Sequence, residues 1–505
     1  MIGTHGRRSR SETSLGRSQV RPNDNPLTWL LGLLSIVVIL GHFRGYAHQA
    51  PGDFSAFYCA GQSVLHRADP YLVEPELSCE TRLGVAFEGK VVLPAPLPAY
   101  DFVPFVLLAK FAPRIAALLY AAAMLAAMAI IAYCVKELAG LPLGVAAAIA
   151  TIGISYDSVD WGQLAPFAVA AIAVAALLLR RNRPVSAGVV LCLGLMQPQF
   201  GLPAVISTWL CVKRSRRPIV ISVLVLIAAA LAAVGIRGLA EYPKVLALQS
   251  QAEVYWVSQY SLTWLVHALG GGVRTALAAG SASYIVLVVA SLLAVYRYRR
   301  QAIATSAVVF LPATAAVLGG SFIHDYQIKV ALAAAVVIFA RMPLGLAPAI
   351  AIGLLYMPFG NAVHAFKLTE LPSIVAALGG IWATVYFLSR DNARKAARTR
   401  ATIAAAVAFA YYVFFAVVTP HQPVVASLAG QVITHNATAL ASQEYLYFMD
   451  HFQRLQHVPT LFLILLKLPL WIGLIVLLTS ALRNLDVGGP EASLAEPRGY
   501  AMPMT

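Results

Sequence analysis

Long apolar segments separated by clusters of arginine and lysine constrain this chain more than any other feature. One apolar segment covers residues 115–135, and another covers residues 276–296 and is followed by Arg297, Arg299 and Arg300. A helix needs about 20 predominantly apolar residues to cross the hydrocarbon core of a bilayer. Because 59% of the 505 residues are hydrophobic and only 12% are charged, the sequence predicts an integral membrane protein.

The formal net charge of +15 has two interpretations. In a soluble protein it would suggest nucleic-acid binding. Here the basic residues gather between apolar segments, at residues 180–183, 213–217 and 390–400, as they do in the cytoplasmic loops of membrane proteins. We therefore expect the lipid bilayer, and no nucleic acid, as a partner of this chain.

The alternation of apolar segments and basic loops predicts an all-α polytopic membrane protein with about 12 to 14 transmembrane helices and both ends in the cytoplasm. Three parts are expected along the chain: a disordered basic tail at residues 1–25, a membrane domain at 26–482 and a cytoplasmic tail at 483–505. The extracytoplasmic (outer) loops are expected near residues 47–112, 235–274 and 420–458.

Residues 185–211 are apolar enough to be one span, but a single crossing would place the basic cluster at 213–217 outside. A break at Gln197-Pro198-Gln199 turns the segment into two short helices that return to the cytoplasm. Both halves are shorter than the roughly 20 residues of a full span. The predicted turn therefore lies within the membrane and faces a protein-lined or wet cavity.

The first outer loop is predicted to begin with an amphipathic helix that lies on the bilayer surface. Its apolar and small residues recur at helical spacing: Phe54, Phe57, Tyr58, Gly61 and Leu65. Asp53 falls in the first turn, where a carboxylate is either an N-cap or a reactive group. Both interpretations remain open.

Two other features mark this loop. Prolines interrupt its C-terminal part, which is typical of a kinked cavity wall; they are Pro94, Pro96, Pro98, Pro104 and Pro113. Cys59 and Cys79 also lie in the loop. Whether they form a disulfide stays open, because sequence does not show whether their Cα atoms lie within bonding reach.

The order of residues in this loop resembles the first outer loop of glycosyltransferase family 87. The resemblance lies in Asp53-Phe54, Tyr58, the Ala60-Gly61 pair, Leu65 and the Asp69-Pro70-Tyr71 run. It implies the polytopic GT-C architecture and a similarity to mannosyltransferases that use polyprenol-phosphate-mannose. It also implies that Asp53, the acid of the first outer loop, is the catalytic base. Asp69 and Asp101 are the alternatives, although Asp69 precedes a proline and suits a turn.

Other short motifs extend the resemblance. Gly162-Gln163 is similar to a Gly-Gln pair of the family, and His324-Asp325-Tyr326 is similar to a His-Asp-Tyr segment. A turn at a helix end explains the first motif nearly as well, and an interfacial belt of His and Tyr explains the second equally well. Gln197 stands where the family often has lysine, so a phosphate contact there is in doubt.

Asp53 is the predicted catalytic residue. The residues expected to bind substrate are Tyr58, Tyr71, Gln163, Arg237, His324, Asp325 and Lys329. Lys329 follows His324 by about one helical turn and is expected to add positive charge at the same cavity mouth. No cofactor is expected, and no metal, because the cysteines and histidines lack metal-ligand spacing.

Together these features predict a hexosyltransferase of the inner (plasma) membrane whose active site faces the extracytoplasmic side. It would transfer a hexose, mannose by the resemblance, from a polyprenyl-phosphate sugar donor to a glycolipid or glycan acceptor with inversion. The alternative is a secondary transporter or a flippase for lipid-linked sugars. The sequence shows no paired halves, and its acids gather in outer loops and not at mid-membrane, which disfavours a carrier.

Overall fold

The computed structural model describes residues 25–47, 50–85, 90–256, 259–357, 370–389, 394–418, 435–452 and 460–487. Most of the two predicted tails, and parts of the outer loop expected near 420–458, lie outside these residues. The helices are α1 (Pro26–Phe43), α2 (Gly52–Leu65), α3 (Val73–Leu83), α4 (Phe102–Leu108), α5 (Pro113–Ala139), α6 (Leu143–Ala148), α7 (Tyr156–Trp161), α8 (Ala165–Arg180), α9 (Pro184–Leu191), α10 (Pro198–Cys211), α11 (Arg216–Glu253), α12 (Leu262–Ala268), α13 (Val273–Arg297), α14 (Arg299–Ala304), α15 (Ala307–Leu318), α16 (Asp325–Ile328), α17 (Val330–Phe339), α18 (Leu346–Tyr356), α19 (Leu371–Leu388), α20 (Arg394–Val418), α21 (Ala441–Phe452) and α22 (Thr460–Val487).

Helices account for all the regular secondary structure of the described residues, beyond two isolated β-bridges. Among the residues that the structure describes, six helical segments are long and apolar enough to cross a membrane, and five more apolar helices are shorter. The predicted all-α, polytopic character is therefore confirmed. On the outside of α11, apolar side chains such as Val220, Ile221 and Leu224 are exposed, as expected for a surface that faces lipid.

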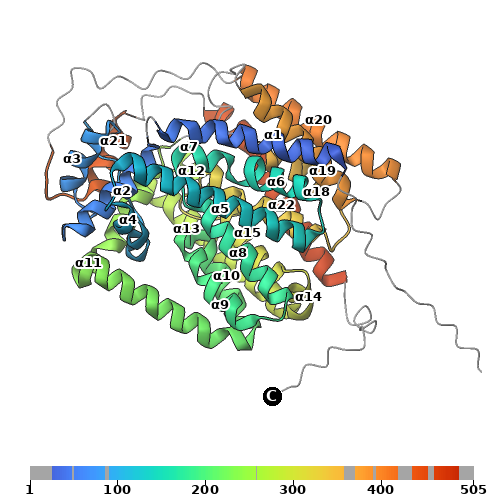
Figure 1. Ribbon diagram of the computed structural model, residues 1–505, viewed down its shortest axis with the longest axis horizontal. Helices are drawn as coiled ribbons and strands as arrows, with labels where there is room; N and C mark the ends of the chain where they lie inside the picture. The colour runs from blue at the N-terminus through green and yellow to red at the C-terminus, as the bar shows by residue number, and fades with distance from the viewer. Residues whose placement is uncertain are drawn as a thin grey trace, which may run out of the picture.

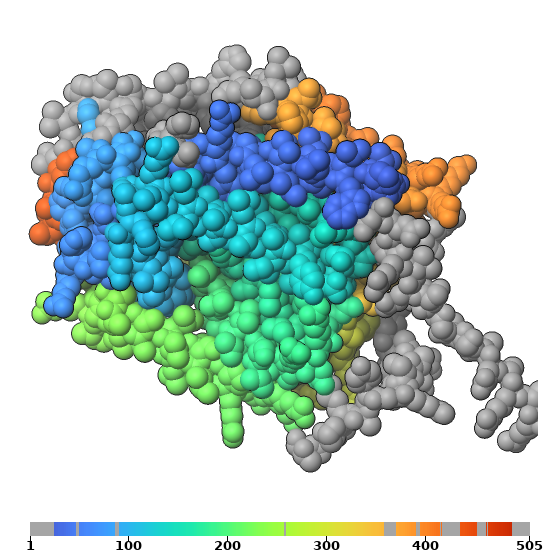
Figure 2. All heavy atoms as spheres, viewed as in Figure 1, coloured from blue at the N-terminus to red at the C-terminus, as the bar shows by residue number. Residues whose placement is uncertain are grey.

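The elements of the first outer loop gather at one end of the molecule (Figure 1). There α2 packs against α3 and α4, and α21 packs against α3 and α11. Figure 2 shows the first-loop helices of this group in blue, above the light green α11, with the orange-red α21 at their side. The helices of the membrane body, such as α5, α8, α10 and α15, pack on one another beyond this end.

Close contacts between small residues set the packing of the body. A side chain at Gly144 of α6 would overlap the backbone of α1 at Thr28, and one at Gly32 would meet Gly144. Glycine at both positions lets the two backbones approach closely, which is how helices commonly associate in membranes. Helix α1 itself starts at Pro26, after Asn25, whose side chain accepts a hydrogen bond from the Leu27 amide at 3.2 Å.

The predicted break at Gln197 is confirmed. Helix α9 passes into a short 3₁₀ turn over Cys192–Met196, Gln197 leaves helical geometry, and α10 begins at Pro198. A Cβ at Gly201 of α10 would overlap the carbonyl of Gly194. The two halves therefore fold back on each other with no side chain between them at this point.

The second outer loop, predicted to start at residue 235, is largely helical. Helix α11 continues through Gly235, which has a φ of +67°, and ends at Glu253. Glycine tolerates this left-handed geometry, so the helix is kinked and not terminated there. The second half of α11 reaches α4 and α21 of the outer group, and this contact supports the continuation.

The predicted helix at Asp53 exists as α2, but the expected position on the bilayer surface is wrong. Nine of its residues are buried, from Phe54 to Ser63, and a side chain at Gly61 would overlap the Phe105 backbone of α4. Helix α2 is enclosed by α3, α4 and α5 because its small residues let neighbours approach on more than one side. A disulfide joins Cys59 of α2 to Cys79 of α3.

Candidate active site

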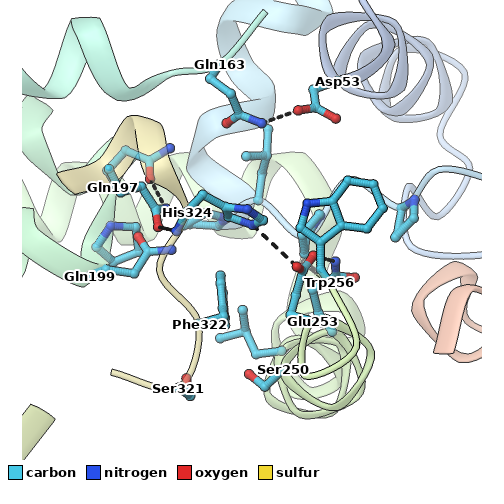
Figure 3. A pocket seen from close by; sticks show the side chains of 18 of the residues that line it. Asp53, Gln163, Gln197, Gln199, Ser250, Glu253, Trp256, Ser321, Phe322 and His324 are labelled. Atoms are coloured by element: carbon cyan, nitrogen blue, oxygen red, sulfur yellow. Dashed lines mark hydrogen bonds and ion pairs between the residues drawn. The ribbon is translucent and has the colours of Figure 1, made fainter. Parts of the chain in front are cut away.

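A cavity of about 840 Å³ opens where the outer group meets the membrane body. Its walls come from the start of α2, the proline segment before α4, the ends of α7 and α11, the break before α10 and the segment before α16. The volume is within the usual range for small-molecule sites, about 300 to 1,000 Å³. Asp53, Gln163, Gln197, Glu253 and His324 all line it (Figure 3).

Asp53 is the second residue of α2, and it does not cap that helix. The N-cap is Pro51, and the Asp53 carboxylate instead accepts a hydrogen bond from the side chain of Gln163 (Figure 3). Burial raises the pKa of Asp53 to about 7; the Gln163 hydrogen bond opposes this shift and the nearby Glu253 adds to it. The carboxyl therefore changes charge near neutral pH, as suits a general base.

Gln163 reaches Asp53 because α7 ends abruptly. Gly162 has a φ of +74°, and a Cβ there would lie 2.7 Å from the Cβ of Phe54. Tyr120 donates a hydrogen bond to the Gly162 carbonyl at 2.9 Å, and the Gln163 amide donates to the Ser158 carbonyl at 2.9 Å. These contacts hold the turn against the first residues of α2.

His324 lies on the opposite side of the cavity, just before α16. Its backbone amide donates to the Gln327 side chain at 3.0 Å, and its ring stacks on Tyr326 with centroids 5.1 Å apart. Nε2 of His324 lies 3.4 Å from the Glu253 carboxylate. Burial lowers the pKa of His324; Glu253 opposes the shift and Lys467 adds to it. Asp325, the residue after His324, also lines the cavity. Burial and the nearby Asp157 raise the pKa of the Asp325 carboxyl to about 7.

The break before α10 forms a third wall. Gln197 is 5% exposed, and its side-chain oxygen accepts a hydrogen bond from Gln327 at 2.9 Å. Gln199 also lines the cavity, and its Oε1 atom is buried without a hydrogen-bond partner among the described residues. Pro94, Pro96 and Pro98 line the cavity as predicted, whereas Pro104 and Pro113 do not.

The charge of the cavity is unusual for a site that would hold a phosphate. Within the described part of the chain, the titratable groups on its wall are Asp53, Glu253, His324 and Asp325 with four tyrosines and no lysine or arginine. Glutamine side chains supply neutral hydrogen-bond donors in their place. Such a site can take a proton at Asp53 and donate hydrogen bonds to a ligand opposite it.

Residues 96–323 match the model of glycosyltransferase family 87. The predicted resemblance is therefore confirmed, and it indicates a membrane glycosyltransferase. The matched segment includes Gln163, Gln197 and Glu253, begins after Asp53 and ends one residue before His324. Neither the curated proteins nor the solved structures gave a significant match.

Four of the residues predicted to bind substrate lie away from the cavity wall. The hydroxyls of Tyr58 and Tyr71 donate to the carbonyls of Phe111 and Leu97. Arg237 is exposed on α11. Lys329 is buried, lies 3.1 Å from Asp157 and donates to the carbonyls of Leu355 and Met357. Helical spacing placed Lys329 near His324 along the chain, but its side chain points into the body.

The alternative acids also have other surroundings. Asp69 accepts a hydrogen bond from the Tyr71 amide at 2.9 Å, which is the turn role expected before a proline. Asp101 is 2% exposed and lies outside the cavity lining. Of the three candidates for a base in the first outer loop, only Asp53 reaches the cavity.

Sequence reasoning missed Glu253, Gln259 and Lys467. The side-chain amide of Gln259 donates a hydrogen bond to Glu253 and lies 3.1 Å from Nε2 of His324. Lys467 of α22 donates to the Gln259 carbonyl. Lys467 lies 3.2 Å from the centroid of the Trp264 ring. A lysine inside the apolar segment at 461–478 was a usable signal, because an ionisable residue at membrane depth usually has a buried partner. Glu253 had no comparable signal.

Proposed function

We propose that this membrane glycosyltransferase transfers a hexose, mannose by the resemblance, from a polyprenyl-phosphate donor to a glycolipid or glycan acceptor. The proposal includes a GT-C type architecture, the inner (plasma) membrane, and a cavity open to the extracytoplasmic side. The observation that carries it is Asp53, a carboxyl with a pKa raised to about 7 on the wall of a cavity of about 840 Å³.

In the proposed reaction, Asp53 takes the proton of an acceptor hydroxyl. The acceptor oxygen forms a bond to the anomeric carbon of the donor sugar, and the bond from that carbon to the phosphate oxygen breaks. The phosphate leaves with the electron pair. One in-line displacement inverts the anomeric centre. The base contributes by general catalysis, typically about 10² to 10⁴-fold in rate.

The wall opposite Asp53 would receive the leaving phosphate. His324, Gln197 and Gln199 meet there, and their ring and amide N–H groups are hydrogen-bond donors. Gln199 Oε1 is buried and unpartnered among the described side chains, so a sugar hydroxyl would satisfy it. Fixed donors in a site that excludes water stabilise developing negative charge without reorganisation.

The same cavity has an apolar flank suited to a lipid-linked substrate. Leu202 of α10, Leu246 of α11 and Tyr284 of α13 line it. Leu202 is 44% exposed on the outer surface of the body, so this flank is continuous with a surface that would face lipid. A headgroup in the cavity and a chain in the bilayer fit this arrangement.

The test is glycosyl transfer in membranes that contain the full-length protein, with labelled polyprenyl-phosphate mannose as the donor. We expect Asp53→Asn to lower transfer by at least about 10²-fold. Asp69→Asn is the matched control, because asparagine keeps the oxygen that accepts from the Tyr71 amide. Full activity of Asp53→Asn would overturn the proposal, and movement of the donor across the membrane without transfer would favour a flippase.

A further inference from the structure

One face of the second half of α11 lines the cavity and changes in character along its length. Its residues recur every three or four positions, as neighbours on one helix face do; they are Tyr242, Leu246, Gln249, Glu253 and, just past the last turn, Trp256. Leu246 belongs to the apolar flank, whereas Gln249 and Glu253 are polar and Trp256 is aromatic. The apolar flank and Glu253 are therefore about two helical turns apart.

Gln249 supplies an unused hydrogen-bond acceptor in the polar part of this face. Its side chain is 5% exposed, and Nε2 donates to Glu253 Oε1 at 2.8 Å. Because a carboxylate only accepts, the orientation of the Gln249 amide is fixed and Oε1 is its remaining atom. That oxygen is buried and has no hydrogen-bond partner among the residues that the structure describes. A buried acceptor in this state is unfavourable, so a ligand hydroxyl in the cavity would satisfy it.

Glu253 adds a second acceptor one turn further along. It is 6% exposed and lines the cavity. Oε2 accepts from Gln259 at 2.8 Å and faces His324, whereas Oε1 accepts from Gln249. Each carboxylate oxygen can accept two hydrogen bonds. Oε1 therefore keeps capacity for a ligand hydroxyl, and the two amides hold the carboxylate in a fixed position.

Trp256 forms an aromatic platform next to these acceptors. Its ring packs against a buried cluster formed by Val91, Ala252, Tyr445, Phe448 and Met449. The indole is partly exposed and lines the cavity, on the side away from Gln197 and Gln199 (Figure 3). A flat apolar ring held by packing on one side and open to a cavity on the other suits the C–H face of a sugar.

The polar groups at this end of the cavity define the chemical class of ligand. Burial raises the pKa of Tyr445, and the nearby Glu253 and Asp53 add to the shift, so the Tyr445 hydroxyl lies close to both acids. No lysine or arginine of the described chain lines the cavity, which disfavours an anionic ligand beside two carboxylates. An alcohol with one hydroxyl would leave Gln249 or Glu253 without a donor, whereas a neutral sugar has several hydroxyls.

We propose that Gln249, Glu253 and Trp256 form the acceptor subsite, and that the acceptor presents a neutral sugar ring there. This assignment deepens the function proposed above and rests on it. The sugar stacks on Trp256, its hydroxyls donate to Gln249 Oε1 and Glu253 Oε1, and the attacking hydroxyl faces Asp53. The lipid of the donor lies at the Leu246 end, so the two substrates occupy different parts of one helix face.

A binding test needs no donor and no turnover. Full-length protein labelled with fluorotryptophan in lipid nanodiscs is titrated with the octyl glycosides of mannose, glucose and galactose, and the Trp256 signal in ¹⁹F NMR is assigned by its loss in Trp256→Leu. We expect at least one of these neutral glycosides to shift the signal saturably. Octyl glucuronide, which is anionic, and octanol, which has one hydroxyl, should not shift it.

Two controls separate binding at the subsite from partition into the bilayer. Trp382 of α19 is 37% exposed and outside the cavity lining, so its signal reports partition alone. Gln249→Leu should raise the half-saturating glycoside concentration about tenfold or more, whereas Gln251→Leu, partly exposed on the same helix, should not. No shift with any neutral glycoside, an equal shift with octanol, or an unchanged half-saturation in Gln249→Leu would overturn the proposal.

A kinetic test assigns the subsite to the acceptor, with labelled polyprenyl-phosphate mannose as donor and the tightest-binding glycoside as acceptor. Trp256→Leu should raise the KM for the acceptor about tenfold or more and leave the KM for the donor unchanged. Leu246→Gln, on the same helix face, should do the reverse, and Trp382→Leu should change neither. An equal rise of both KM values in Trp256→Leu, or no transfer to a glycoside that binds, would overturn the assignment.

The two proposals fail in different ways. Full activity of Asp53→Asn in native membranes would remove the proposed function, while saturable glycoside binding at Trp256 would stand by itself. Transfer that depends on Asp53 but keeps its acceptor KM in both Trp256→Leu and Gln249→Leu would leave the function intact and remove the subsite. Gln249→Leu also covers the case in which Trp256→Leu fails to fold.

Discussion

The side-chain amide of Gln163 donates a hydrogen bond to the carboxylate of Asp53, across 110 positions of sequence. Gln163 follows the end of α7 in the membrane body, and Asp53 lies in the first turn of α2 in the outer group. The pair therefore joins the two parts of the molecule at the cavity wall.

Asp53 should make transfer depend on pH near neutrality. Burial raises the pKa of its carboxyl to about 7, so the carboxyl is protonated below that pH and cannot accept a proton. We expect kcat/KM to fall about tenfold per pH unit on the acidic side of a midpoint near pH 7. A pH profile with labelled donor measures this. A constant rate from about pH 5 to about pH 8 would contradict the role of Asp53 as the base.

Loss of the Gln163 amide should move that midpoint upward. The Gln163 hydrogen bond lowers the pKa of Asp53 and so opposes the effect of burial. Gln163→Leu should raise the pKa further, shift the acidic limb to higher pH and lower kcat/KM at pH 7 by about 10-fold or more. Gln251→Leu is the control, because Gln251 lies outside the cavity lining and its side chain donates to the Ala247 carbonyl of its own helix. A profile with an unchanged midpoint would show that the hydrogen bond does not tune Asp53.

Lys329 should matter for stability and not for donor binding. Its ammonium group lies 3.1 Å from Asp157 and is buried. Lys329→Met removes the cation beside the buried Asp157 carboxylate. Such a loss typically lowers the free energy of unfolding by about 3 to 5 kcal/mol. The double variant with Asp157→Asn should recover much of this loss.

Thermal unfolding in detergent measures the effect, and Lys136→Met is the control because its ion pair with Glu137 is exposed. If Lys329→Met unfolds like the wild type but raises the KM for the donor, Lys329 contributes to the cavity mouth as the sequence suggested.

Glu80 should make the folded protein less stable as the pH rises. Burial raises the pKa of its carboxyl from 4.5 to about 8, opposed by the hydrogen bond from the Leu93 amide. Between these values the folded state binds more protons than the unfolded state, so the free energy of unfolding falls with increasing pH.

Glu80→Gln should remove part of this slope and raise the Tm above that of the wild type near pH 8. Tm measured in detergent across this range tests the expectation. Glu74→Gln, in the same helix but partly exposed, is the control. If the Tm of Glu80→Gln changes with pH in the same way as that of the wild type, the raised pKa of Glu80 is contradicted.

Much of the site could be predicted from sequence because its residues stand in short motifs. Asp53, Gln163 and His324 were all expected, and all three line the cavity. Tyr58 and Lys329 were expected beside them but point elsewhere. Position along a helix gives spacing, whereas the direction of a side chain depends on how the whole helix is rotated against its neighbours.

The sequence by itself determined that this chain is helical, membrane-embedded and broken at Gln197, because hydropathy and proline act locally. Only the tertiary structure decided that α2 is enclosed, that α11 continues past Gly235, and that Glu253, Gln259 and Lys467 meet behind His324. These three residues come from α11, the segment after it and α22. No local pattern connects such distant segments; their contact arises when the helices pack.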